Sequence, residues 1–291
     1  MHEITPQPGI HGCPSMPCEP DGADIDHGAD IDCGKDAHRR IFALGAHTSK
    51  GGRWRNEDSL VISGDFACVS DGIGGARHGD VTSRLACSTM RDEWEALSEQ
   101  GLSLGERMRL ALSHVDSFLS TVAARLGGGP GATIVAMACE ASSLVVGSVG
   151  DSRAYVLDGE TAVPVLPETG RVQDGDNALS AALGYGMLSL DEGLAEIAEV
   201  PIADGFRVLL CTDGVWTVLT EREMGELLAN GGSAPWPIAH QLVGQAVSAG
   251  GEHGDNATAL VGIMAGSRQV SGRLDSAPPA SLEEAKEEAS S

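Results

Sequence analysis

The feature of this sequence that most constrains its fold is a recurring pattern, in which an apolar, strand-like run ends in an aspartate within a tight turn. The pattern delivers Asp71 in FACVSDGIGG, Asp213 in RVLLCTDG and Asp151 in VVGSVGDS, and Asp255 opens DNATALVGIM just before a last apolar run. Taken singly, each Asp-Gly pair is an ordinary turn signal. Four carboxylates at strand ends, far apart in sequence, are what a hard-metal site assembled from a sheet would need.

The charge of the chain limits its partners. Acidic residues outnumber basic ones 42 to 19, and the formal net charge is -23. This balance argues against a surface that binds nucleic acid or an anionic membrane. Part of the acidic excess would suit a site for cations, and most of it is expected to lie on solvated surface.

Cysteine usage and the absence of apolar spans favour a cytoplasmic protein. The cysteine count is odd and no CxxC pair occurs, so neither a zinc site nor a redox motif is indicated. Four cysteines lie in apolar surroundings and are predicted to be reduced thiols: Cys68, Cys87, Cys139 and Cys211. The N-terminal sequence MHEITPQPGI is unlike a signal peptide, and no run approaches the roughly 18 apolar residues of a membrane span.

The chain is predicted to form one domain, residues 39–266, between two disordered acidic tails, residues 1–38 and 267–291. The first tail is rich in Pro, Gly and Asp and contains GADID twice, and the second ends in SLEEAKEEASS. The aspartate spacing of the first tail resembles a calcium loop only faintly, because no glutamate closes it at the required place. A disordered tail is therefore favoured over a calcium site.

Within the domain, the periodicity predicts an α+β fold, an antiparallel sandwich covered by helices. Apolar residues spaced by three and four predict helices over 79–97 and 104–126, and two further helices are predicted over 220–229 and 237–249. Thr220 and Glu223 have the spacing of a capping box. Strands are predicted at 41–47, 59–63, 66–70, 132–139, 143–149, 153–157, 193–200, 206–212 and 257–265. The three strands from 132 to 157 are interpreted as a meander, and the next two as a pair.

Six motifs occur in the order seen in the PPM/PP2C family of metal-dependent protein serine/threonine phosphatases, which the sequence therefore resembles. They are GGRWRNED at 51–58, SDGIGG at 70–75, GAT at 131–133, GDSRA at 150–154, TDG at 212–214 and DNAT at 255–258. The resemblance spans about residues 42 to 265 and is typical of bacterial members. It implies two antiparallel β-sheets in a sandwich flanked by pairs of helices, with a metal centre at one end.

The resemblance also implies a set of oxygen ligands for two ions, Mn²⁺ or Mg²⁺. Asp71 would bridge both ions, Asp213 and Asp255 would hold one, Glu57 and the backbone carbonyl of Gly72 would hold the other, and Asp151 would share a third, weaker position with Asp213. Two such cations lower the pKa of a bridging water and neutralise charge on the phosphoryl oxygens, so Asp71 is assigned a catalytic role. The alternative interpretation of Glu57 and Asp58 is a solvated surface pair.

Arg53 matches the arginine that holds the substrate phosphate in the family. A guanidinium offers a bidentate fork to a phosphate. Arg55 competes for this role, but Arg53 lies four residues before Glu57, as the family pattern requires. GDSRA superficially resembles a nucleophile elbow around Ser152, yet it ends in alanine and no helix is predicted after it. His47, His78 and His253 lie near the motifs and are interpreted as surface residues.

Two departures from the family pattern affect its substrate chemistry. Ile73 stands where some members have a histidine proposed as a general acid, so protonation of the leaving group would fall to water or to an unidentified group. The segment between Leu157 and Leu183 lacks the usual Asp-His-Ser stretch, and the flap that it forms is predicted to be short.

The predicted function is hydrolysis of phosphoserine and phosphothreonine in proteins by a hydroxide that two metal ions activate. The expected partners are phosphoproteins and a cognate serine/threonine kinase, with no nucleic acid and no membrane, and the chain is expected to be a monomer. The alternative is a catalytically silent relative that binds phosphoproteins as a sensor. A hydrolase that uses Ser152 is a third hypothesis.

Overall fold

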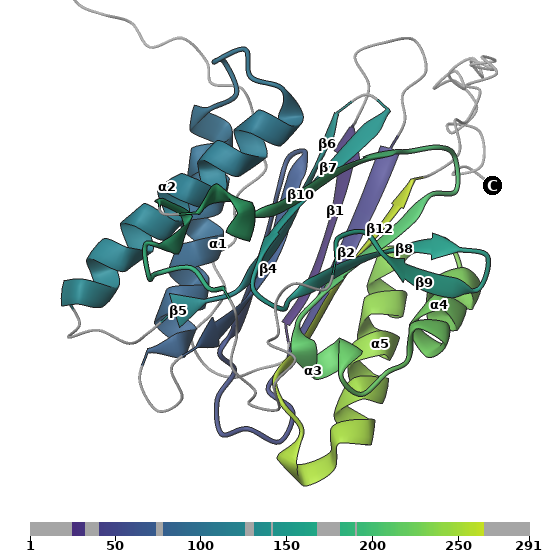
Figure 1. The fold of residues 1–291 in the computed structure, drawn as a ribbon. Helices are drawn as coiled ribbons and strands as arrows, with labels where there is room; N and C mark the ends of the chain where they lie inside the picture. Colours follow the sequence, from purple (N-terminus) through teal and green to yellow (C-terminus); the bar gives the residue numbers. More distant parts are fainter. Residues whose placement is uncertain are drawn as a thin grey trace, which may run out of the picture.

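Two antiparallel sheets lie face to face between two layers of helices (Figure 1). The computed structural model describes residues 25–32, 41–73, 78–125, 131–140, 142–167, 181–189 and 191–264. The first sheet has the order β1 (Ile25–Asp32), β2 (Ile41–Ser49), β12 (Ala257–Met264), β11 (Arg207–Cys211), β8 (Arg153–Asp158) and β9 (Thr161–Pro164). The second has the order β10 (Glu196–Pro201), β7 (Ser143–Val149), β6 (Ile134–Glu140), β4 (Phe66–Ile73) and β3 (Asp58–Ser63), with β5 (Gly131–Ala132) paired to β4.

The helices cover the outer faces of the sandwich in pairs. Helices α1 (Gly79–Ala96) and α2 (Leu104–Arg125) pack on the second sheet, and α4 (Glu221–Asn230) and α5 (Pro235–Gly250) pack on the first (Figure 1). Short helical turns complete the described elements: α3 (Asp213–Trp216), η1 (Met187–Ser189), η2 (Glu192–Leu194) and η3 (Gly251–His253). The predicted α+β class, with two antiparallel sheets flanked by helix pairs, is confirmed. None of the helices within the described ranges combines the length and apolar character that crossing a bilayer requires.

Three layers of apolar side chains explain why the central strands are apolar almost throughout. In β4, Phe66 and Cys68 pack beneath α1 and α2, whereas Ala67 and Val69 pack against the other sheet. Strands β6 and β11 alternate in the same manner. Because side chains of a strand alternate between its faces, a strand buried on both faces needs apolar residues at every position.

The predicted helix pattern and thiol state are also confirmed. Met90 and Trp94 of α1 and Met108 and Leu112 of α2 are fully buried at their spacing of four residues. The capping box at the start of α4 forms, since Thr220 and Glu223 exchange hydrogen bonds between side chain and backbone. The four cysteines predicted to be reduced are buried thiols.

The prediction that residues 1–38 are disordered is wrong for residues 25–32. These residues form β1, which pairs with the outer edge of β2 along its whole length. An edge strand is held by main-chain hydrogen bonds, so it does not need the apolar alternation by which strands are recognised in a sequence. The other residues of both tails, and the domain limits 39 and 266, lie outside the described residues, so these limits remain predictions.

Two predicted strand pairings are wrong. Strands β6 and β7 pair as expected, but β8 crosses to the first sheet and pairs with β11, so no three-stranded meander forms. Strands β10 and β11 lie in different sheets, because β10 pairs with β7 and β11 pairs with β12 and β8. Neighbouring strands in sequence often pair, yet the partner is decided by the whole sandwich.

The close approach of α5 to β2 generates a test of this packing. A Cβ atom at Gly45 would lie 2.3 Å from the backbone nitrogen of Trp236. Gly45→Ala is therefore expected to lower the free energy of unfolding by about 1–3 kcal/mol, since the α5 backbone has to move. Urea unfolding followed by circular dichroism would measure the change.

Gly244 provides a matched control on α5, because a Cβ atom there would meet nothing within 4 Å. Gly244→Ala is expected to raise the free energy of unfolding by up to about 1 kcal/mol through helix propensity. Equal stabilities of the two variants would contradict the packing of α5 on β2.

Candidate functional site

The predicted site residues come from connections at one end of the sandwich. The β2–β3 connection, α3 and the connection from α5 to β12 lie together at the lower end in Figure 1. Asp71 lies near the end of β4, Asp213 follows β11, and Asp151 follows β7. Glu57 instead immediately precedes β3, and Asp255 lies two residues before the start of β12. Neighbouring strands of an antiparallel sheet run in opposite directions, so the start of one strand lies beside the end of the next. All five acidic side chains can therefore share one site at the same end of the sandwich.

Electrostatic interactions show that the aspartates of this end lie close to one another. Burial raises the pKa of Asp71 well above its ordinary value, and the charges of Asp58, Asp213, Asp255 and Asp151 raise it further, in that order. Each neighbour disfavours the charged form of Asp71, as a nearby like charge does. The four predicted aspartates therefore form one electrostatic cluster, to which Asp58 also belongs.

Asp58 is the residue that the sequence interpretation missed. It is 6% exposed, and the hydroxyls of Thr212 and Thr258 donate hydrogen bonds of 2.8 and 2.6 Å to its Oδ2. Burial, and secondarily the charges of Asp213 and Asp255, raise the pKa of Asp58 to about 7 against the two hydroxyl donors, which lower it. The interpretation of Asp58 as half of a solvated pair is wrong.

A signal for this burial was present in the sequence. Asp58 is two residues before Leu60, and Leu60 packs in the core between the sheets, with Ile62 against it. Because alternate residues of a strand share a face, Asp58 points in the same direction as these two. It is also the register partner of Asp71 across β3 and β4.

Glu57 and Gly72 both lie next to the start of α1. The Gly72 amide donates to the Glu57 carbonyl at 3.1 Å. A Cβ atom at Gly79 would lie 2.8 Å from the carbonyl oxygen of Gly72 and 3.0 Å from Oε1 of Glu57. The two oxygens predicted to serve one metal ion thus face the same narrow space, which only a glycine at position 79 leaves open.

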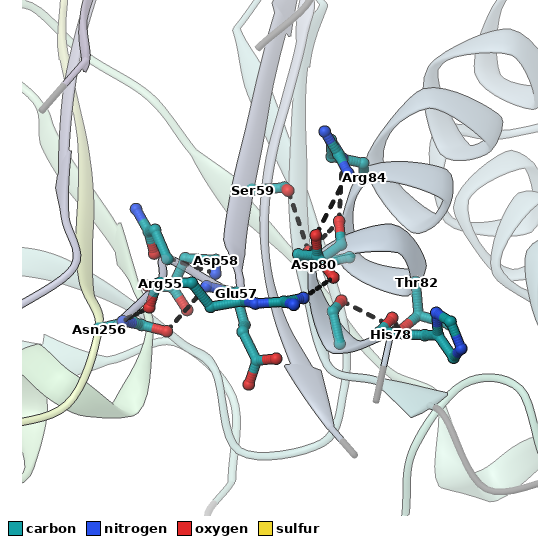
Figure 2. A network of polar contacts seen from close by, with 12 residues as sticks. Arg55, Glu57, Asp58, Ser59, His78, Asp80, Thr82, Arg84 and Asn256 are labelled. Atoms are coloured by element: carbon teal, nitrogen blue, oxygen red, sulfur yellow. Dashed lines mark hydrogen bonds and ion pairs between the residues drawn. The ribbon is translucent and has the colours of Figure 1, made fainter. Parts of the chain in front are cut away.

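The loop that carries Glu57 and Arg53 is tied to the start of β12 by Asn256. Its Oδ1 accepts from the Glu57 amide at 2.8 Å, and its Nδ2 donates to the carbonyls of Lys50 and Arg55, both at 2.9 Å (Figure 2). The sequence offered no signal for these contacts beyond the presence of Asn256 in a motif, because the partners are about 200 residues apart.

The two candidate arginines have different surroundings. Arg53 is half-exposed, and its Nη2 lies 2.7 Å from Oδ2 of Asp255. Arg55 forms an ion pair with Asp80 of α1 at 2.5 Å (Figure 2). Its guanidinium also lies 4.0 Å from the centroid of the Trp54 ring. Arg53 therefore lies beside a predicted metal ligand, whereas Arg55 connects the loop to α1.

Thr133 connects Asp71 to the turn that carries Asp151. Its Oγ1 accepts from the Asp71 amide at 3.0 Å and lies 2.7 Å from the hydroxyl of Ser152. The indole of Trp216 donates to the Asp151 carbonyl at 2.9 Å. Ser152 is 3% exposed and engaged with Thr133, which disfavours it as a nucleophile for an incoming substrate.

The three histidines near the motifs differ in exposure. His47 is 6% exposed and its ring lies 4.6 Å from that of His240, so its interpretation as a surface residue is wrong. His78 and His253 are exposed. His78 precedes α1 with φ of 70°, and its carbonyl accepts from the amides of Val81 and Thr82.

The donors of the site fit a hard divalent cation. Glu57 Oε1 and Asp58 Oδ1 are buried and have no hydrogen-bond partner among the described residues, and such orphaned oxygens are costly unless a cation or water satisfies them. Oxygen-only donors suit Mg²⁺ and Mn²⁺. Within the described ranges, however, no three His, Cys, Asp or Glu side chains already converge as a metal-binding group, and Asp255 is paired with Arg53. The site therefore has the required residue types and needs side-chain adjustment to bind an ion.

Comparison with known proteins gives concordant results. A family model described as Protein phosphatase 2C matches residues 53–231. The serine/threonine phosphatase stp of Listeria monocytogenes is 30% identical over 233 residues, which cover 72% of this chain and 87% of that protein. The serine/threonine protein phosphatase PstP of Mycobacterium tuberculosis is 28% identical over 225 residues, which cover 72% of this chain and 42% of that protein.

Solved structures share the fold. PppA, described as a key regulatory component of T6SS in Pseudomonas aeruginosa, is 26% identical with a TM-score of 0.66 and covers 77% of this chain and 97% of its own. The catalytic domain of PstP, solved in complex with 2 manganese ions, is 22% identical with a TM-score of 0.65 and covers 78% of this chain and 99% of its own.

The raised pKa values of Asp58 and Asp71 predict how the stability of metal-free protein depends on pH. The folded protein binds more protons than the unfolded chain between about pH 4 and 7, so its stability falls as the pH rises through this window. In Asp58→Asn the melting temperature of chelator-treated protein should fall less steeply over the same window. Scanning fluorimetry would compare the two slopes.

Mn²⁺ added above pH 7 should raise the free energy of unfolding of the wild type by about 2.7 kcal/mol at 100 times the dissociation constant, and its melting temperature should rise accordingly. Equal pH slopes in the wild type and Asp58→Asn, or a melting temperature that does not respond to Mn²⁺, would contradict this description of the site.

Proposed function

Because the chain belongs to the protein phosphatase 2C family, we propose that it is a metal-dependent phosphatase that hydrolyses phosphoserine and phosphothreonine in proteins. The observation that carries the proposal is the cluster of aspartates at one end of the sandwich, each of which raises the pKa of Asp71. A buried cluster of like charges costs stability unless cations neutralise it. Phosphoryl transfer is a reaction that such a cation site can serve.

The proposed ligands follow the family pattern. Asp71 would be shared by two ions, Mn²⁺ or Mg²⁺, with Asp213 and Asp255 on one, Glu57 and the carbonyl of Gly72 on the other, and Asp151 with Asp213 on a third, weaker position. The orphaned Oε1 of Glu57 and its proximity to the Gly72 carbonyl support the second pair. When bound, a pair of divalent cations supplies a nucleophile at neutral pH and neutralises charge on the phosphoryl oxygens.

The residues of this chain position the ligands and the substrate. Thr133 fixes the main chain at Asp71 through its hydroxyl and its amide, which donates to the Asp71 carbonyl at 2.9 Å. Thr212 and Thr258 hold the side chain of Asp58 in place within the cluster. Arg53 would exchange its ion pair with Asp255 for the substrate phosphate, to which a guanidinium can donate two parallel hydrogen bonds. This exchange would also release Asp255 to its ion.

The proposed functional partner follows from the reaction. A phosphatase for phosphoserine and phosphothreonine consumes the product of a serine/threonine kinase, so such a kinase is the proposed functional counterpart. A cytoplasmic location and a monomeric state remain predictions from the sequence.

Replacement of Asp213 tests the metal centre. Asp213→Ala should lower Mn²⁺-dependent hydrolysis of a small aryl phosphate at least about 100-fold, more than the roughly 10- to 100-fold loss typical when a residue that hydrogen-bonds a metal ligand is replaced. EDTA should abolish activity of the wild type. Asp158→Ala, an exposed aspartate at the end of β8, should retain the wild-type rate.

Chelator-insensitive turnover, or full activity of Asp213→Ala, would contradict the proposed function. A wild-type protein that binds Mn²⁺ and phosphoprotein without turnover would instead support the silent sensor.

The arginine pair gives a second test. Arg53→Ala should lower kcat/KM about 100-fold or more, as loss of a donor to transition-state charge does, and Arg53→Lys should restore only part of it because the fork is lost. Arg55→Ala should have a smaller effect, since Arg55 is engaged with Asp80 and Trp54. A larger loss in Arg55→Ala than in Arg53→Ala would exchange their assignments.

A further inference from the structure

A buried carboxylate in the middle of α2 holds a segment that the mechanism above does not use. Asp116 is 1% exposed and accepts three backbone hydrogen bonds, from the amides of Gly184 at 2.8 Å, Gly186 at 3.2 Å and Leu188 at 2.9 Å. Hydrogen bonds from backbone amides to a carboxylate are strong, and they orient the backbone that donates them. One side chain of α2 therefore fixes the course of residues 184–188.

The conformation of this segment turns Tyr185 outward. Gly184 and Gly186 have φ of 96° and 67°, a region that glycine adopts without strain. Their amides both face Asp116, and Tyr185 between them is 48% exposed. A half-exposed aromatic ring on a segment held this firmly is a preformed contact surface.

The segment continues the backbone ladder of the candidate site. Leu183 exchanges hydrogen bonds of 2.8 and 3.1 Å with Ala132, and Ala132 is the register partner of Gly72. Residues 183–185 thus lie one strand away from the strand end that carries Asp71 and Gly72.

The Tyr185 ring packs on the backbone of this ladder. A Cβ atom at Gly131 would lie 2.7 Å from Cε2 of Tyr185 and 2.8 Å from the carbonyl oxygen of Leu183, so the ring requires glycine at position 131. Gly131 is the register partner of Ile73, which follows Gly72.

We propose that Tyr185 determines specificity by packing against an apolar side chain adjacent to the phosphorylated residue of the substrate, and that Asp116 is the positioning residue that holds the ring there. The inference rests on the proposed phosphatase function. The ring lies next to the end of β4 across β5, so a phosphoserine bound at the end of β4 would bring its neighbouring residues within reach of the ring. A tyrosine ring carries no positive charge that would attract the phosphate itself, whereas its face can pack against an apolar side chain.

The test uses the full chain with Mn²⁺ and two phosphoserine peptides, one with leucine and one with glycine on both sides of the phosphoserine. The wild type should favour the leucine peptide about tenfold in kcat/KM, mainly through KM, as burial of one apolar side chain permits. Tyr185→Ala should reduce this preference to about one, whereas Tyr185→Phe should keep it because the ring remains.

Phe118→Ala is the matched control, since Phe118 is a similarly exposed aromatic residue of α2 at 44%. It should keep the wild-type preference. An unchanged preference in Tyr185→Ala, or equal losses for both peptides, would overturn the inference.

Asp116→Asn tests the positioning role. An asparagine can keep only one of the two acceptor oxygens, so it loses either the Leu188 amide or the two glycine amides. It should lower the leucine preference, but in the Tyr185→Ala background it should change the preference no further, because both changes act through one ring. An unchanged preference in Asp116→Asn alone, or a change of preference caused by Asp116→Asn in the Tyr185→Ala background, would overturn the role of Asp116.

Binding of the same two peptides, each carrying a fluorescent label and followed by fluorescence anisotropy, separates this inference from the proposed function. If the wild type hydrolyses neither peptide, the proposed function fails, and the ratio of dissociation constants still decides the role of Tyr185. A binding preference that Tyr185→Ala abolishes supports the inference, and equal affinities of the wild type for both peptides overturn it.

Discussion

The site depends on the cost of holding several carboxylates together at a poorly solvated end of a protein. Each of the aspartates around Asp71 makes ionisation of Asp71 harder, and burial adds the largest contribution. Neutral donors offset part of this cost at Asp58, where two threonine hydroxyls converge on one oxygen. A divalent cation would change the sign of the interaction, since it attracts every carboxylate at once. In that sense the fold maintains a repulsive arrangement that bound cations would make favourable.

The sandwich maintains this arrangement because both sheets are rigid and both contribute to it. Asp71 and Asp58 belong to the second sheet, whereas Asp213 and Asp255 flank strands of the first. The strands between them are packed on both faces. A carboxylate at the end of such a strand cannot retreat from its neighbours without disturbing a close-packed core. The short connections at the site add further restraint, as the contacts of Asn256 illustrate.

Two buried aspartates illustrate how surroundings decide the role of one residue type. Asp116 accepts three backbone amides through its two oxygens, so it is satisfied by the chain itself and serves to hold a loop. Asp58 has one oxygen bound by threonines and another that is buried without a partner among the described residues. A buried carboxylate whose oxygens are all hydrogen-bonded within the protein has a structural role. A buried carboxylate with an unsatisfied oxygen next to other acids instead indicates a binding site.

The sequence by itself determined the helices of the sandwich, most of its strands, the reduced thiols and the order of the motifs, because these follow from periodicity and turn chemistry over a few residues. It also selected Asp71, Asp151, Asp213 and Asp255 as one group. Only the tertiary structure decided that β8 leaves the strands before it for the other sheet, that residues 25–32 add an edge strand, that Asp58 is buried, and that Asp116 holds Tyr185 beside the site. Each of these rests on contacts between residues far apart in the chain, and local patterns carry no information about which distant partner the packing of two sheets will select.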